Sequence, residues 1–168
     1  MGKLFLLCFL LLPCLSHAQG LSLYNLLAVY DNKDEEAADV YLLQRGWERA
    51  TSRSAEKTKT WAYGKTLKQP IGNQGADSVK RKFQAEAWLS ITMKDERRSL
   101  IYSMPSQTAM LFIREQMQKV GMKRTDYNST NERIIATYEG NGYRINIVTV
   151  IAFSSDGKNL YSFSIRHL

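Results

Sequence analysis

The feature that most constrains the fold is an internal repeat, which appears when the chain is compared with itself at an offset of 75 residues. Residues 41–49 resemble residues 116–124, and Gly46 matches Gly121 without a gap. Two segments that share spacing and residue types favour the same local structure. The repeat therefore predicts one structural unit formed twice.

Further along the chain the offset changes to 60, so that Leu100 matches Leu160. The change places a 15-residue insertion in the first copy, within residues 65–82. At the corresponding place the second copy has only residues 139–142, whose Asn-Gly step is typical of a tight hairpin.

A helix is predicted at the start of each copy. Residues 34–36 and Ser106 are typical helix starts, and Gly46 and Gly121 are the residue type that ends helices in a left-handed conformation. A further short helix is predicted over residues 22–30, where apolar residues recur at helical spacing.

Four strands are expected after each helix. In the first copy they are predicted at residues 47–53, 57–64, 83–93 and 99–104, with equivalents in the second copy. The clearest alternation of apolar and polar residues runs from Tyr143 to Phe153 and indicates a half-buried strand. The predicted fold class is α+β: a tandem duplicated unit of one helix, or a helix pair, and a four-stranded antiparallel sheet, with the helices on one face. The two units would form either one eight-stranded sheet or two lobes.

The first residues have the pattern of a cleavable secretory signal. Lys3 supplies the positive charge, residues 4–12 are apolar, and residues 16–18 place small side chains before Gln19. The apolar run is shorter than the roughly 20 residues of a membrane-spanning helix. We therefore expect a bacterial protein without a transmembrane anchor that is either exported to the periplasm or secreted.

The expected boundaries follow from the signal and the repeat. Residues 1–18 would be removed, residues 19–104 would form the first repeat with its inserted loop, and residues 105–168 would form the second. An alternative for the signal is lipidation of Cys14, against which Pro13 argues.

Cysteine usage and charge limit how the mature chain is stabilised and what it binds. Cys8 and Cys14 both lie in the signal, so the mature chain would form no disulfide and must rely on a packed core.

The net charge of +7 falls by one with the loss of Lys3. Because the basic residues are scattered among carboxylates, the charge is typical of ordinary solubility and gives no clear nucleic-acid signal.

The order of these elements resembles a known architecture. Residues 42–47 close a helical segment with a Gly-aromatic step, four strands follow, and the whole arrangement is duplicated. This resembles the beta-lactamase inhibitory protein family and exported proteins of the Bacteroidetes, over nearly the whole mature chain. The likeness is architectural: no interface motif matches, and the disulfides of the inhibitor are absent. It implies the fold and favours protein binding, but it transfers no site.

Catalytic chemistry is sparse. The mature chain has no cysteine, and its one histidine, His167, lies beside the C-terminus, where we expect a loose side chain. These counts exclude Cys-His pairs and zinc sites built from cysteine and histidine. The acidic residues Asp34, Glu35, Glu36 and Asp39 are explained by the dipole of the helix that they begin. We expect no catalytic residue, no metal and no cofactor.

The alternation along the third strand distinguishes Trp88. If Ala87 and Leu89 face the helices, Trp88 lies on the opposite face of the sheet with Gln84 and Glu86. An exposed tryptophan on an open sheet face is a suitable anchor for a protein partner. The alternative is that Trp88 packs beneath the insertion.

The insertion itself is the second candidate site. Residues 65–82 include Lys68, Lys80 and Arg81, and a loop of this length is usually either functional or disordered. Its basic residues would contact an acidic partner in the first case and remain solvated in the second.

The leading hypothesis is an exported, non-enzymatic protein-binding module that acts as an inhibitor or a toxin-neutralising immunity protein. The alternatives are a structural or adaptor protein of the envelope, and a hydrolase that uses carboxylates in a cleft between the repeats. The sequence indicates neither the partner nor an oligomeric state.

Overall fold

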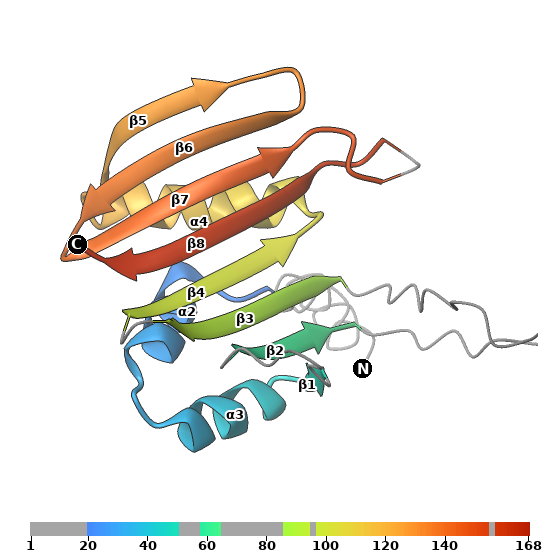
Figure 1. Cartoon of the computed structure of the whole chain (residues 1–168), viewed down its shortest axis with the longest axis vertical. Helices are drawn as coiled ribbons and strands as arrows, with labels where there is room; N and C mark the ends of the chain where they lie inside the picture. Colours follow the sequence, from blue (N-terminus) through green and yellow to red (C-terminus); the bar gives the residue numbers. More distant parts are fainter. Residues whose placement is uncertain (1–19, 51–57, 65–85, 95–96, 155–156) are drawn as a thin grey trace, which may run out of the picture.

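The computed structural model describes residues 20–50, 58–64, 86–94, 97–154 and 157–168 (Figure 1). The helices are α2 (Leu23–Asp31), α3 (Glu35–Leu43) and α4 (Gln107–Lys119). The strands are β1 (Trp47–Ala50), β2 (Thr58–Tyr63), β3 (Ala87–Lys94), β4 (Arg97–Met104), β5 (Lys123–Ser129), β6 (Arg133–Gly140), β7 (Tyr143–Val150) and β8 (Leu160–His167). The α+β class is confirmed.

All of these strands belong to one antiparallel sheet of eight strands, in the order β1-β2-β3-β4-β8-β7-β6-β5. Each group of four strands is a meander, and the two meanders meet where β4 pairs with β8 (Figure 1). Tyr102 and Phe163 are cross-strand partners at this junction. Of the two arrangements left open by the sequence, the structure has the single sheet.

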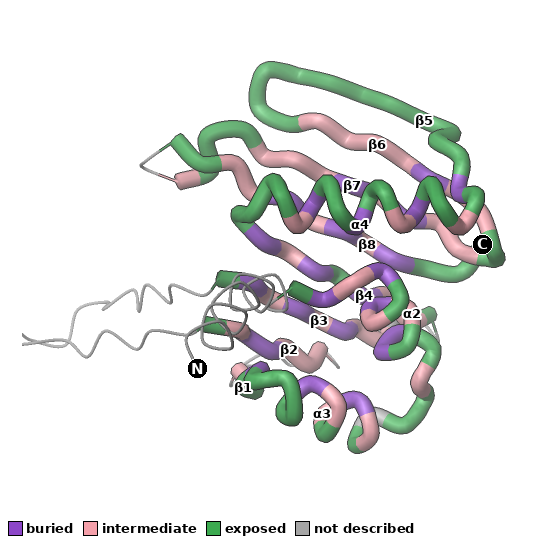
Figure 2. The backbone as a smooth tube through the Cα atoms, turned by 180° about the vertical axis from the view of Figure 1, so that it is seen from behind, coloured by how far each residue is buried: buried purple, intermediate pink, exposed green. Residues whose placement is uncertain are grey.

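The helices lie on one side of the sheet, with α3 beside β1 and with α2 and α4 over the middle strands (Figure 2). Inward-facing side chains alternate with outward-facing ones along the strands, as in β8, where Tyr161, Phe163 and Ile165 are buried. Met110, Ile113 and Met117, which recur at helical spacing in the sequence, are the buried residues of α4 and form its inner face. The core therefore lies between the sheet and the three helices.

Polar side chains begin the helices as the sequence predicts. Asp34 accepts hydrogen bonds from the backbone N–H groups at the start of α3, and Ser106 accepts one from the start of α4. Ser22 forms a reciprocal cap with Asn25 at the start of α2. These bonds use donors that would otherwise have no partner in the first turn.

Glycines with positive φ follow two of the helices. Gly46 follows α3 with φ 78° and Gly121 follows α4 with φ 79°. The hairpin between β6 and β7 is also confirmed, because Asn141 and Gly142 have φ values of 54° and 81°, the pattern of a type I′ turn.

One predicted strand ends earlier in the structure than the alternation suggests. β7 ends at Val150 rather than at Phe153, which is exposed. The chain turns at Ala152, which has a φ of 50°. The apolar alternation in the sequence continues past this turn and therefore does not mark the end of the strand. The other predicted strands are found with shifted ends, and residues 51–53 and 83–85 lie outside the described residues.

Leu100 and Leu160, which the offset of 60 matches in the sequence, lie on opposite faces of the sheet. Leu100 is fully buried opposite Ile165, on the side of the helices. Leu160 precedes the buried Tyr161 in β8 and so points to the other face. A one-residue difference in register reverses the face, and the similarity of two leucines does not reveal it.

Arg98 belongs to the charged run of residues 95–98, which the sequence predicts as a solvated hairpin tip, but its side chain makes contacts within the molecule. Its guanidinium donates to the backbone oxygens of Asn32 (2.6 Å) and Val29 (3.2 Å), at the C-terminal end of α2. A cation at that position compensates the free carbonyl groups and the helix dipole. Arg98 therefore attaches α2 to β4.

Candidate functional site

The face of the sheet opposite α2 and α4, here called the open face, carries Trp88. Ala87, Leu89 and Ile91 are buried on the helix side, which confirms the predicted alternation for these described residues of β3. Trp88 therefore lies on the open face, where its cross-strand partners are Ala62 and Ser103. Trp88 is half-buried and Ala62 is only 4% exposed, so this end of the face is not a bare surface.

Small hydroxyl side chains lie on β2, β3, β4 and β8 of the open face. Three pairs are linked across neighbouring strands: Thr58 with Thr92 (3.1 Å), Thr60 with Ser90 (3.0 Å) and Ser103 with Ser162 (2.8 Å). Because these side chains are short and hydrogen-bonded to one another, they leave a low surface that another molecule can approach closely.

A row of charged side chains, here called the charged row, crosses the open face on β8, β7, β6 and β5. It consists of Arg166, Arg144, Glu139 and Lys123, which are consecutive cross-strand partners. Glu139 forms an ion pair with Arg144. Arg166 is exposed, and the pairing places it directly opposite Arg144, an arrangement that is unfavourable without a compensating anion. The row has three cations and one carboxylate.

The predicted site residues are distributed differently. Gln84, Lys68, Lys80 and Arg81 lie outside the described residues. Glu86 is not placed beside Trp88: it precedes β3, where the alternation does not yet apply, and it lines a pocket on the helix side. Of the two predicted residues that the structure describes, Trp88 is placed on the open face and Glu86 is not.

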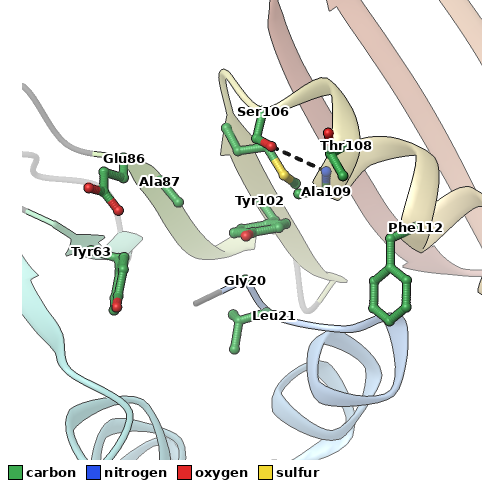
Figure 3. Close-up of a pocket in the computed structure, with 11 residues that line it drawn as sticks. Gly20, Leu21, Tyr63, Glu86, Ala87, Tyr102, Ser106, Thr108, Ala109 and Phe112 are labelled. Atoms are coloured by element: carbon green, nitrogen blue, oxygen red, sulfur yellow. Dashed lines mark hydrogen bonds between the residues drawn. The ribbon is translucent and has the colours of Figure 1, made fainter. Parts of the chain in front are cut away.

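The pocket lies on the helix side, at the N-terminal end of α4, and has a volume of about 490 Å³ (Figure 3). Tyr63 and Glu86 lie at one side of it and Phe112 lies at the other. The remaining described lining residues are mostly small or apolar: Gly20, Leu21, Ala87, Tyr102, Met104, Ser106, Thr108 and Ala109. We call it the α4 pocket. Sequence spacing did not predict it, because four separate segments form it.

Tyr102 has a titratable group at the wall of this pocket. Burial raises the pKa of its phenol to about 12, and a backbone hydrogen bond with Leu21 opposes this shift. The phenol is therefore neutral at physiological pH.

A cluster of polar and aromatic side chains joins the C-terminal end of α2 to the start of β7 and the end of β8. Tyr143 donates a hydrogen bond to Asp31, which raises the pKa of Tyr143 to about 12. The ring of His167 stacks on Tyr143 at 5.2 Å, and its Nε2 lies 3.7 Å from the Asp31 carboxylate. The backbone N–H of His167 donates to the Tyr30 hydroxyl at 2.9 Å. The prediction of a loose terminal histidine is therefore wrong, since β8 extends to this residue and holds it.

Two of the acidic residues near α3, Asp34 and Asp39, have structural partners. Asp34 caps the helix, as predicted. Asp39 accepts a hydrogen bond from the indole Nε1 of Trp61 at 2.6 Å and pairs with Arg49 at 3.2 Å. These contacts join α3 to β1 and β2.

Comparisons with known proteins found no match: no protein-family model, no curated protein and no solved structure is similar to this chain. The resemblance to the inhibitory protein family therefore stays a prediction. Within the described part of the chain, no helix has the length and apolar composition needed to span a membrane. The same residues contain no group of three or more His, Cys, Asp or Glu side chains arranged to hold a metal ion.

Proposed function

We propose that the protein is an exported, non-enzymatic protein-binding module that holds an acidic protein partner on its open face. The observation that carries the proposal is the distribution of side chains on this face. A half-buried tryptophan lies on β3, low hydroxyl pairs lie between the strands, and a row with net positive charge crosses the second half of the sheet. None of the described helices covers this face.

Each part of the face has a separate role in binding. Trp88 supplies a large apolar surface at low entropic cost, as tryptophans at the centre of interfaces do. The hydroxyl pairs leave room for close approach and further hydrogen bonds. Arg166 and its neighbours in the charged row attract a partner with an acidic surface and determine its orientation.

We further propose that the two halves are a tandem duplication, each half a helix followed by four strands. The support is the order of the strands, which runs outward in both directions from β4 and β8, and the positive φ of Gly46 and Gly121 at the ends of α3 and α4. Joining two such units edge to edge doubles the width of the open face. An inhibitor or an immunity protein requires this kind of wide contact surface.

The carboxylates that suggested the enzymatic alternative give it little support, because they have structural contacts. Asp34 and Asp39 are used in capping and in contacts between elements. Among the described residues, an enzyme would use the cluster of Asp31, Tyr143 and His167 for acid-base chemistry. An envelope adaptor would share the open face but would assemble in fixed arrays rather than bind one inhibited partner.

The test compares charge reversals on the two sides of the molecule. Arg166→Glu changes the charged row, whereas Arg114→Glu makes the same change at an exposed position of α4, on the helix side. The tagged wild-type chain and both variants are used to capture partners from an envelope extract of the source cells, and the bound protein is quantified.

We expect one acidic protein at a fixed ratio with the wild type and with Arg114→Glu. Arg166→Glu should weaken its binding by at least about tenfold, because like charges placed against one another across an interface cost several kcal/mol. Equal capture by all three chains, or capture of no protein at a fixed ratio, would refute the proposal.

A further inference from the structure

The α4 pocket lies on the side of the sheet that the proposed function does not use. Its volume of about 490 Å³ falls within the roughly 300–1,000 Å³ of pockets that bind small molecules. The described lining has an apolar floor and rim, with Leu21 and Met104 buried and Phe112 52% exposed. Such a lining favours a ligand with a compact apolar body.

The polar groups of the pocket lie in two places, with Glu86 and the phenol of Tyr63 on one side and the hydroxyls of Ser106 and Thr108 at the start of α4 (Figure 3). Of the described lining residues only Glu86 is charged, and it lies with the phenol of Tyr63 opposite Phe112 (Figure 3). No hydrogen bond or ion pair joins the Glu86 carboxylate to any other described residue. Because Glu86 is exposed, a positive group on the ligand would form a solvent-screened ion pair with it at the mouth of the pocket.

The position of Glu86 is fixed by its surroundings. Its backbone N–H donates to the oxygen of Tyr63 at 2.9 Å, which holds the start of β3 against the end of β2. Its side chain lies over Gly64, where a Cβ atom would approach the Cγ of Glu86 to 2.6 Å. Gly64 also has a φ of 65°, so both its conformation and this close approach require glycine. The carboxylate thus rests on a surface shaped to receive it.

We infer that the α4 pocket binds a small amphiphile with a compact apolar body and a cationic head group, with the body against Phe112 and Met104 and the head group at Glu86. If the N-terminal end of α4 determined which ligand binds, the pocket would instead favour an anionic head group. The backbone N–H of Ala109 is already used there by Ser106, and the next N–H, of Met110, donates to the Ser106 backbone oxygen. Two of the N–H groups at this end are thus bonded within the helix, and Glu86 is the one charged residue among the described lining residues.

The experiment uses three ligands with the same alkyl chain and different head groups: octylammonium, octanol and octanoate. Each is titrated calorimetrically, below its micelle concentration, into the full chain and into the chain as processed on export. We expect octylammonium to bind about twofold to fivefold more tightly than octanol, the range of an exposed ion pair, and octanoate to bind most weakly.

Two variants separate the head group from the body. Glu86→Gln should reduce the affinity for octylammonium to that for octanol and leave octanol unchanged. Ala109→Phe fills the pocket and should abolish binding of all three ligands. Because Ala109→Phe can disturb packing, Phe112→Ser provides a second test: this side chain is exposed, the fold does not depend on it, and its loss should weaken all three ligands severalfold.

Glu115→Gln is the matched control, since it removes one carboxylate from the exposed side of α4, away from the pocket. It should change nothing. Tighter binding of octanoate than of octylammonium, or unchanged binding after Phe112→Ser, would overturn the inference. Trp88→Ala distinguishes this site from the open face, because it should leave octylammonium binding intact whether or not the protein partner is lost.

Discussion

At the scale of single residues, Trp88 either anchors a partner or only packs within the molecule, and one substitution distinguishes these two roles. Its side chain is half-buried on the open face beside the buried Ala62. If it anchors a partner, Trp88→Ala should keep the melting temperature and weaken binding by about 2 kcal/mol or more. Thermal melts and affinity measurements on the same variant test this.

The alternative for Trp88 gives the opposite pattern. A tryptophan that only packs within the molecule would lower the melting temperature by several degrees when truncated. Partner binding by the folded fraction would then remain normal. That result would end the role of Trp88 as an anchor.

Tyr102 leads to a prediction about alkaline stability. Its pKa is raised from 10.0 to about 12, so the folded state keeps the proton that the unfolded state loses. The resulting stabilisation is present below pH 10 and is lost as the pH rises towards 12, with a total of about 2 to 3 kcal/mol. Urea unfolding at a series of pH values should show this loss in the wild type and a smaller one in Tyr102→Phe.

Tyr143 supplies the comparison for this experiment. Its pKa is raised to about 12 mainly by the hydrogen bond to Asp31, but the residue is only half-buried and solvent screens the interaction. Tyr143→Phe should therefore change the alkaline loss less than Tyr102→Phe. An equal effect of both substitutions would contradict burial as the cause.

At the scale of elements, the ends of α3 and α4 depend on Gly46 and Gly121. Both residues have φ near 80°, where a branched side chain is strained. Gly46→Val and Gly121→Val should each reduce the free energy of unfolding by about 1 kcal/mol or more. Chemical denaturation of both variants measures the loss.

The surroundings of the two glycines make them a matched pair. A Cβ at Gly121 would meet no atom within 4 Å, and one at Gly46 would meet only the ring of Tyr63, at an ordinary contact distance of 3.5 Å. The strain of the backbone is therefore the common cause, and the two losses should be similar. Unchanged stability of both variants would refute the capping role and weaken the argument for duplication.

At the scale of the whole molecule, the pairing of β4 with β8 makes one sheet from the two meanders. These strands have neighbours on both sides, whereas β5 is an edge strand whose residues are all exposed. Native-state hydrogen exchange should therefore be slowest in β4 and β8 and faster in β5, because central strands open only with most of the structure. Exchange of the β4 and β8 amides at the rate of the β5 amides would indicate two halves that unfold separately.

Local signals in the sequence predicted the elements well. Asp34 and Ser106 begin helices because their side-chain oxygens bond to the next turn, and Gly46 follows one because its φ is positive. The face of Trp88 followed from the alternation of its neighbours. Each of these features depends on residues a few positions apart, which the sequence displays directly.

The tertiary structure decided the features that depend on distant segments. The single sheet and the charged row require the register between strands, which spacing does not specify, as the opposite faces of Leu100 and Leu160 illustrate. His167 is held by Tyr30 and stacks on Tyr143, and the α4 pocket is formed by four segments. The sequence by itself determined which segments form helices and strands and which of their faces are apolar, because these depend on short-range sterics and hydrogen bonds. Which faces and edges then met was decided by packing between segments that lie far apart in the chain.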